Sequence, residues 1–378
     1  MTSYKLLATA AMGLESIVAN EVKELGYETT TDNGKVFFQG NERDIAKANL
    51  WLRTADRVKL IAGEFTASTF DDLFEQTKAI EWEKFLPVDA EFPVQGKSVK
   101  STLHSVPTCQ SIVKKAIVER LKKAYQHNSF LAETGPRFKI EVSILKDKVQ
   151  LSIDTSGAGL HKRGYRVGQG EAPLKETLAA ALVKLSRWTP DRPFVDPFCG
   201  SGTIVIEAAM IGQNLAPGYN REFDSEHWPW VGEDIWNEVR EEAENLADYD
   251  QPLNILGTDA DSRMIQIAEE NIIEAGFAGL IRLQQRDVKD FTTDEENGVV
   301  IGNPPYGERI GEVEVIEEMI GDMGQVFSRF PTWSVYMLSS MEGFEKLYGQ
   351  KATKKRKLYN GFIRTDLFQF WGERPKNK

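Results

Sequence analysis

Four consecutive residues, Asn303-Pro304-Pro305-Tyr306, could hold a planar base by its exocyclic amine. They follow the apolar run 299–301, which is typical of a buried strand. The two prolines lack backbone donors and fix φ, so the loop is stiff and leaves carbonyl groups free. The Asn303 amide oxygen and the Pro304 carbonyl could accept both N–H bonds of an amine, while Tyr306 stacks on the ring. The loop therefore predicts attack by an amine on an electrophilic methyl group; a plain proline turn is the alternative.

A second segment, 194–203, has the order strand, glycine loop and helix start. Gly200 and Gly202 would let the backbone approach a ligand closely. The loop has neither the Gly-Lys-Ser/Thr of a P-loop nor a full G-x-G-x-x-G, and the Asp196 carboxylate would repel a phosphate. The same carboxylate could orient the cationic amino-acid end of S-adenosylmethionine. An ordinary glycine turn is the alternative. The candidate cofactor residues of this loop are Asp196, Pro197, Phe198, Cys199, Gly200, Ser201, Gly202 and Thr203.

The next two strand-like runs also end in acids. Asp259, followed by Ala260, closes the run 253–259, and Asp287, followed by Val288, comes after the run 281–285. In a doubly wound sheet, ligands bind beyond the carboxyl ends of the strands, and an acid after the second strand suits ribose hydroxyls. Asp287 could accept from an adenine amine, although a solvated loop acid is nearly as good an interpretation. Together with Asn303, these acids predict one shared rim.

With these motifs in place, the chain resembles class I S-adenosylmethionine-dependent methyltransferases that act on amines. It resembles most closely the THUMP-domain guanine-N2 methyltransferases of bacterial large-subunit rRNA, in the form with a single methyltransferase domain. The segments 154–157 and 160–166 (Leu-His-Lys-Arg-Gly-Tyr-Arg) are further matches. The segment 172–178 resembles the family's helix before the glycine loop, which implies cofactor contacts for Lys175, Glu176 and Thr177.

The resemblance implies an α/β fold: a Rossmann-like methyltransferase with a seven-stranded sheet and an antiparallel C-terminal hairpin, preceded by an α+β module. We expect a ferredoxin-like part at 1–65, a THUMP-like RNA-binding part at 66–155, a basic linker at 156–171 and the methyltransferase at 172–378. The hairpin should turn at Asn360-Gly361, a strong hairpin signal. Some relatives carry a second methyltransferase domain. Because this sequence resembles the form with one such domain, we expect it to catalyse one modification.

The charge is unevenly distributed along the 378 residues. The net charge is −11, yet residues 92–166 hold 14 lysines and arginines against 5 acids. Such clustering is typical of a nucleic-acid footprint. A second basic stretch at 346–364 contains no acid, although lysines that protect a sheet edge would look the same. The candidate RNA-binding residues are Lys114, Lys115, Lys122, Lys123, His161, Lys162, Arg163, Arg166, Lys354, Lys355 and Arg356. For the lysines between Lys114 and Lys123, a solvated helix face is an equally good interpretation. For the residues between His161 and Arg166, the alternative is a flexible linker.

The remaining composition narrows the function class. Two distant cysteines, Cys109 and Cys199, and four histidines without ligand spacing predict no metal and a reducing, cytoplasmic location. No apolar run approaches the ~20 residues that a membrane span needs. We therefore expect methyl transfer from S-adenosylmethionine to guanine N2 in structured RNA, namely 23S rRNA or a large-subunit assembly intermediate. Two alternatives stay open: an adenine-N6 DNA methyltransferase, and a non-catalytic RNA-binding assembly factor. Glu308 and Arg309 could position the substrate or pair with each other.

Overall fold

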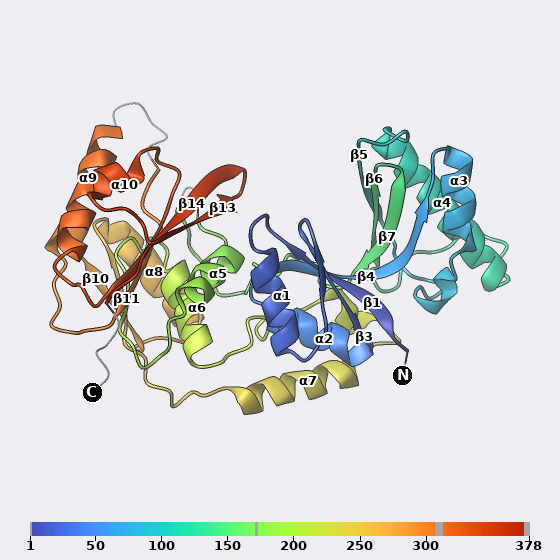
Figure 1. Cartoon of the computed structure of the whole chain (residues 1–378). Coiled ribbons are helices and arrows are strands. Elements are labelled where there is room, and N and C mark those ends of the chain that lie inside the picture. The colour runs from blue at the N-terminus through green and yellow to red at the C-terminus, as the bar shows by residue number, and fades with distance from the viewer. Residues whose placement is uncertain (1, 171–172, 307–312, 374–378) are drawn as a thin grey trace. The chain divides into compact units, whose positions relative to one another are not determined.

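The computed structural model describes residues 2–170, 173–306 and 313–373, and its chain divides into two compact units (Figure 1). The first unit contains residues 1–10, 18–160 and 221–242, and the second contains 11–17, 161–220 and 243–378. The division differs from the expected domains, because residues 221–242 join the first unit although they were expected within the methyltransferase. In that unit Trp228 stacks on Phe138 with 4.5 Å between ring centroids, so the tryptophan serves as core.

The first unit is built on one seven-stranded sheet with the order β2-β3-β1-β4-β7-β6-β5. All neighbouring strands are antiparallel except β5 and β6. The 12-residue strand β4 pairs with β1 on one side and with β7 on the other, so the ferredoxin-like and THUMP-like parts share it. The elements are β1 (Tyr4–Ala10), α1 (Glu15–Glu24, which spans both units), β2 (Thr30–Asp32), β3 (Lys35–Gly40), α2 (Glu42–Trp51), β4 (Ala55–Thr66), α3 (Phe70–Ala79), η1 (Trp82–Lys84), β5 (Val94–Val99), α4 (Val106–Ala124), β6 (Lys139–Leu145), β7 (Lys148–Asp154), η2 (Asp224–His227) and α7 (Glu233–Leu246, whose end lies in the second unit).

The second unit confirms the predicted methyltransferase sheet, with the order β10-β9-β8-β11-β12-β14-β13. Strands β8 to β12 run parallel, whereas β14 is antiparallel to both β12 and β13. The elements are α5 (Glu176–Ser186), β8 (Phe194–Asp196), α6 (Thr203–Gly212), β9 (Ile255–Asp259), α8 (Ser262–Glu274), β10 (Ile281–Gln285), η3 (Val288–Asp290), β11 (Val299–Gly302), α9 (Val313–Phe327), β12 (Ser334–Ser339), α10 (Phe344–Tyr348), β13 (Lys354–Asn360) and β14 (Ile363–Phe370).

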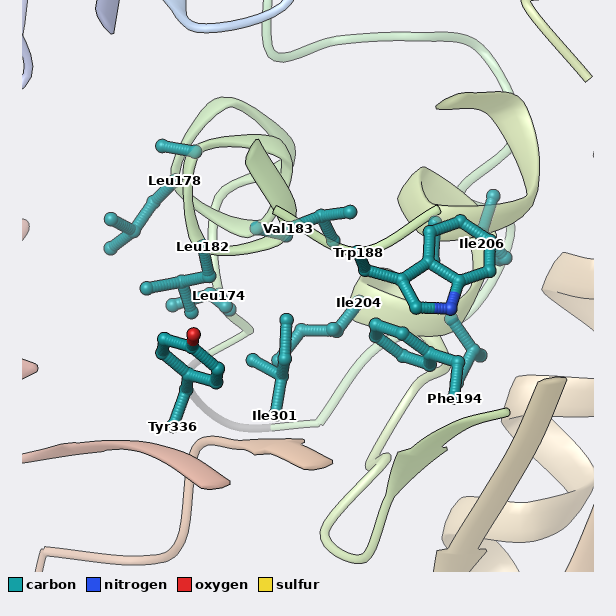
Figure 2. Packing of buried hydrophobic residues seen from close by; sticks show 14 of the residues in the cluster. Leu174, Leu178, Leu182, Val183, Trp188, Phe194, Ile204, Ile206, Ile301 and Tyr336 are labelled. Atoms are coloured by element: carbon teal, nitrogen blue, oxygen red, sulfur yellow. The ribbon is translucent and has the colours of Figure 1, made fainter. Parts of the chain in front are cut away.

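Alternating side chains of this sheet enter two separate cores, as expected for strands covered on both faces. On β11, Ile301 packs in one core with α5 and α6, and Val300 packs in the other with α9 and α10. In Figure 2, the strand residues Phe194, Ile301 and Tyr336 lie against the helical residues of the first core. Both faces being apolar, the polar groups of the strands gather at their ends.

The C-terminal hairpin turns one residue later than predicted. Asn360 is still paired with Ile363, and the two turn residues are Gly361 and Phe362. Gly361 has φ +62°, whereas Phe362 has no positive φ. A glycine at the first of two central positions is typical of a type II′ turn, which matches the twist of the strands. Asn360 therefore belongs to the strand.

The packing of α9 against α10 generates a stability prediction. A Cβ added at Gly324 would lie 1.8 Å from the Tyr348 carbonyl oxygen, whereas one added at Gly321 would lie no closer than 3.7 Å to the Leu347 oxygen. Gly324→Ala is expected to lower the free energy of unfolding by roughly 1–3 kcal/mol, because the two helices must separate. Gly321→Ala, the matched control on the same helix, should raise it by up to about 1 kcal/mol through helix propensity. Urea unfolding measures both; equal stability of the two variants would contradict the packing.

Candidate active site

A cavity of about 770 Å³ opens at the carboxyl ends of β8, β9 and β11. The predicted rim lies there, because the strand-end residues Asp196, Asp259 and Asn303 all line it. The other predicted residues that line it are Pro197, Phe198, Cys199, Gly200, Ser201, Thr203, Ala260, Asp287, Val288, Pro304, Pro305 and Tyr306. The structure thus brings the glycine loop and the Asn303 loop to one cavity of the second unit.

Two main-chain amides of the glycine loop donate hydrogen bonds to residues of β9. The Cys199 amide donates to the Thr258 carbonyl at 2.9 Å, and the Gly200 amide donates to Asp259 Oδ2 at 3.0 Å. Gly200 and Gly202 have φ of +51° and +83°, a region that other residues adopt at a cost. At Gly202, which does not line the cavity, an added Cβ would lie 3.3 Å from Ala268 Cβ. Gly202 therefore shapes the loop from behind, while Gly200 faces the cavity.

Two acids at the strand ends differ in how their charge is balanced. Asp196 is buried and its Oδ1 accepts from the Phe198 amide at 3.0 Å. Its Oδ2 has no hydrogen-bond partner among the residues that the structure describes. Burial raises the pKa of the Asp196 carboxyl well above its usual range, and the nearby Asp259 charge adds to the effect. Burial also raises the pKa of Asp259, although the amides of Asp261 and Gly200 oppose the shift. A buried carboxylate with one unpaired oxygen is suited to a cationic ligand.

Asp287 has a structural role beside its expected contact. Its Oδ1 accepts from the Lys289 amide at 3.1 Å and caps η3, and its Oδ2 lies 3.5 Å from Lys289 Nζ. Val288, the first residue of η3, is buried against Met319 of α9 in the second core. Phe198 packs against the same cluster. Together Phe198, Val288 and Met319 form an apolar wall of the cavity beside Asp287.

Lys175, Glu176 and Thr177 are not among the residues that line the cavity, so their cofactor contact stays a prediction. Glu176 and Thr177 are buried, and Lys175 is exposed at the start of α5. The carboxylate of Glu176 accepts from Arg166 Nε at 2.7 Å. The same guanidinium donates to Ser201 Oγ at 3.0 Å and to Thr203 Oγ1 at 2.9 Å. Glu176 therefore supports the glycine loop through Arg166.

The loop after β11 contains a hydrogen bond that the sequence did not reveal. Tyr306 Oη donates to Asn303 Oδ1 at 2.6 Å, and Asn360 Nδ2 of β13 lies 3.5 Å from the same hydroxyl. A carbonyl oxygen has two lone pairs, so Asn303 Oδ1 can still accept a second donor. The bond fixes the orientation of the Asn303 side chain within the cavity wall. Glu308 and Arg309 lie outside the described residues.

Several wall residues were missed by sequence reasoning. They come from α9, from the β13–β14 hairpin and from the flanks of the predicted motifs: Gly170, Pro173, Leu174, Ile204, Met264, Arg286, Lys289, Val315, Glu318, Met319, Asp322, Asn360 and Ile363. Four of them share one face of a helix by their spacing: Val315, Glu318, Met319 and Asp322. The helical periodicity that places them together was therefore present in the sequence. Nothing in the sequence shows that this face covers the cavity.

The expected RNA contact of the 161–166 segment needs correction at two arginines. Arg163 is buried and its guanidinium contacts the Glu207 carboxylate at 3.3 Å, with Tyr165 Oη donating to the same oxygen at 3.1 Å. Arg166 is engaged with Glu176 and the glycine loop. Neither guanidinium is available to RNA. His161 is half-buried and Lys162 is exposed, so the RNA hypothesis stays a prediction for these two.

The basic residues predicted on α4 and on β13 also fall into two kinds: some contact other protein groups, and others are exposed. On α4, Lys114 Nζ lies 3.4 Å from the Phe92 ring centroid and donates to Glu133 at 2.7 Å. The charge of Lys114 is therefore already paired inside the first unit. Lys115 and Lys123 are exposed and Lys122 is half-buried. On β13, Lys354 and Lys355 are exposed, and Lys355 pairs with Glu345 at 2.7 Å. Arg356 donates to the Gly13 carbonyl at 2.7 Å. The exposed lysines keep their predicted role.

Within residues 2–170, 173–306 and 313–373, no group of three or more histidine, cysteine, aspartate or glutamate side chains could hold a metal ion. Over the same ranges, no helix is long and apolar enough to span a membrane.

Three family models match successive parts of the chain. They are an RlmL ferredoxin-like domain at residues 5–59, a THUMP domain at 67–154 and an RMKL-like methyltransferase domain at 163–369. The "Putative RNA methyltransferase YpsC" of Bacillus subtilis is 62% identical over 100% of this chain and 99% of its own. The "Ribosomal RNA large subunit methyltransferase K/L" of Cellvibrio japonicus is 32% identical over 97% of this chain, which spans 51% of that protein.

Solved structures agree on the fold and differ in name. A "predicted N6-adenine-specific DNA methylase" from Listeria monocytogenes is 62% identical over 99% of this chain and 97% of its own, with a TM-score of 0.95. SMU.472, "a putative methyltransferase complexed with SAH", is 50% identical over 100% of both chains, with a TM-score of 0.96. By the matched domains and these similarities, the chain belongs to the family of RMKL-like methyltransferases that carry an RlmL ferredoxin-like domain and a THUMP domain.

Proposed function

We propose that this methyltransferase transfers a methyl group from S-adenosylmethionine to an exocyclic base amine of RNA, namely guanine N2 in 23S rRNA or in a large-subunit assembly intermediate. The observation that carries the proposal is the shared cavity, in which Asn303 and Tyr306 lie with the Asp196–Thr203 loop. The reaction replaces one N–H bond of the amine by an N–CH₃ bond and releases one proton. With RNA as the substrate, we expect the enzyme to act in the cytoplasm.

The cavity fits S-adenosylmethionine, which supplies an electrophilic methyl group on a sulfonium. Asp196 offers an unpaired buried oxygen to the cationic amino-acid end. Asp259 lies at the end of the second strand, where ribose hydroxyls bind in doubly wound sheets. The wall of Phe198, Val288 and Met319 suits the flat adenine, with Asp287 beside it. SMU.472, bound to SAH, is a relative with this fold and supports the assignment.

The residues around Asn303 would position the base. Asn303 Oδ1 and the Pro304 carbonyl accept from the amine, and the Tyr306 ring stacks on the base while its hydroxyl holds Asn303. Extrusion of a paired base costs a few kcal/mol, which stacking and edge hydrogen bonds in the pocket offset. Most of the rate enhancement would come from holding two reactants in line. No cysteine lies in the loop 303–306 for a covalent route.

An adenine-N6 DNA methyltransferase is the second candidate, because a 62% identical relative has that name. An amide, a carbonyl and an aromatic ring would serve an adenine amine equally well. RNA is favoured by the THUMP match at 67–154 and by exposed lysines of the segment 92–166 such as Lys115 and Lys123. A non-catalytic binding protein is disfavoured, because Asp196, Asp259 and Asn303 line one cavity.

The substrate assignment is tested by the labelled product. The protein is incubated with tritiated S-adenosylmethionine and either an unmodified large-subunit rRNA transcript or duplex DNA of matched length. Digestion and chromatography should place the label in N2-methylguanosine from the RNA. Label in N6-methyladenine from the DNA would overturn the substrate while leaving the site intact. No transfer to RNA, DNA or purified pre-ribosomal particles would overturn the enzyme assignment.

Substitutions in the loop 303–306 should distinguish the contribution of the Tyr306 ring from that of its hydroxyl. Asn303→Ala is expected to reduce the single-turnover rate by roughly 10²–10³-fold, because it removes a positioned acceptor. Tyr306→Ala should cost a similar factor through lost stacking, whereas Tyr306→Phe keeps the ring and should cost less than about tenfold. Cofactor affinity, measured by titration calorimetry, serves as the control and should not change. A Tyr306→Phe enzyme as slow as Tyr306→Ala would assign the role to the hydroxyl.

The pKa of Asp196 generates a pH dependence of cofactor binding. Because burial raises this pKa, the empty site holds a proton on Asp196 up to a higher pH than an ordinary carboxyl. Binding of a cation requires the carboxylate, so affinity for S-adenosylmethionine should increase as pH rises through the raised pKa. Asp196→Asn should weaken binding roughly 10–100-fold and lose this increase. Calorimetry over a pH series compares the two; parallel pH profiles would contradict the role of Asp196.

A further inference from the structure

The Phe362 side chain is fully exposed, and no packing contact among the described residues accounts for an aromatic ring at this position. Its relative exposure is 105%, the largest among the exposed large apolar residues, and Phe130 follows with 82%. It occupies the second turn position of the β13–β14 hairpin, after Gly361. A two-residue turn is short and rigid, so the phenyl ring projects from a fixed support. Exposed aromatic surface on a rigid support is typical of a recognition element.

The turn adjoins the wall of the active-site cavity. Asn360 and Ile363, the last paired residues before and after the turn, both line the cavity. Asn360 Nδ2 lies 3.5 Å from Tyr306 Oη, which in turn donates to Asn303. Phe362 therefore directly precedes one residue of the cavity wall, Ile363, and follows another, Asn360, with Gly361 between them. In Figure 1 the hairpin, coloured red, projects from the sheet of its unit.

The hairpin also presents free positive charge near this ring. Arg364, two residues after Phe362, and Lys357, five residues before it, are exposed and form no ion pair among the residues that the structure describes. Lys354 is also exposed but lies at the far end of the hairpin, opposite Gln369. The sequence 346–364 contains no acid. Exposed cations without a protein partner are suited to the phosphates of a nucleic acid. An apolar tip flanked by such cations favours a nucleic acid over a protein as the occupant.

We propose that Phe362 is a wedge that enters the base stack of the RNA when the target nucleotide leaves it. The inference rests on the proposed function, since it requires an extruded base. Tyr306 stacks on the base inside the cavity, and Phe362 fills the vacated position outside it. Apolar side chains that insert between base steps act in this way in other nucleic-acid complexes. Asn360 of the hairpin lies 3.5 Å from the Tyr306 hydroxyl, so the base position inside the cavity and the Phe362 ring are held close to one another.

The test compares Phe362→Ala and Phe362→Trp in single-turnover methyl transfer with saturating enzyme on the unmodified large-subunit rRNA transcript. Phe362→Ala should lower the maximal rate roughly 10–100-fold, because one stacking contact is lost. Phe362→Trp should restore most of the rate. Ile273→Ala, which removes an exposed apolar side chain of α8 that does not line the cavity, is the matched control and should leave the maximal rate unchanged. Cofactor affinity should be equal in all four proteins.

A second substrate distinguishes a wedge from a general contact. On a short single-stranded oligonucleotide that spans the mapped site, no base has to leave a duplex, so Phe362→Ala should match the wild type. An equal defect on both substrates, or a wild-type rate on the transcript, would overturn the wedge while methyl transfer by the wild type still stands. A change in oligomeric mass on Phe362→Ala would also overturn it, because the ring would then serve a protein contact. Absence of transfer by the wild type would instead refute the proposed function.

Discussion

The site depends on the anchoring of one arginine. Arg166 joins Glu176 at the start of α5 to Ser201 and Thr203 of the glycine loop, at 2.7–3.0 Å. Next to it, Asn271 of α8 donates to the Ser201 carbonyl at 2.8 Å and accepts from the Val167 amide at 2.9 Å. Charge-assisted bonds that are mostly buried hold their geometry well. The glycine loop is thereby fixed from behind, and its front is free to face a ligand.

This arrangement explains why basic residues in the 161–166 segment have unlike roles. Arg163 is taken up by Glu207, which is fully buried, and Arg166 by the loop. A buried ion pair contributes little net stability, but removing one partner leaves a costly charge. These arginines therefore maintain the cavity, and the proposed binding of RNA would depend on other, exposed cations such as Lys354 and Lys357. Basic clustering along the sequence overestimates the charge that a substrate can meet.

The sequence predicted the parts of the site that follow from local order. Asp196, Asp259 and Asn303 each end a strand, and parallel strands bring such ends together whatever the loops do. The face of α9 and the Asn360–Ile363 end of the hairpin were not predicted, because their position depends on long-range packing. Nor did the sequence show that Arg166 would join Glu176 to Ser201 and Thr203 of the glycine loop.

The central claim is that donor and target amine share one cavity, and binding of a joined analogue tests it most directly. In such an analogue, the adenosine and amino-acid parts of the cofactor are linked covalently to guanine N2. Calorimetric titration should show tighter binding than that of S-adenosylhomocysteine, with the advantage lost in Asn303→Ala while affinity for S-adenosylhomocysteine is retained. If the joined analogue binds no more tightly than S-adenosylhomocysteine, Asn303 and the glycine loop do not serve one reaction.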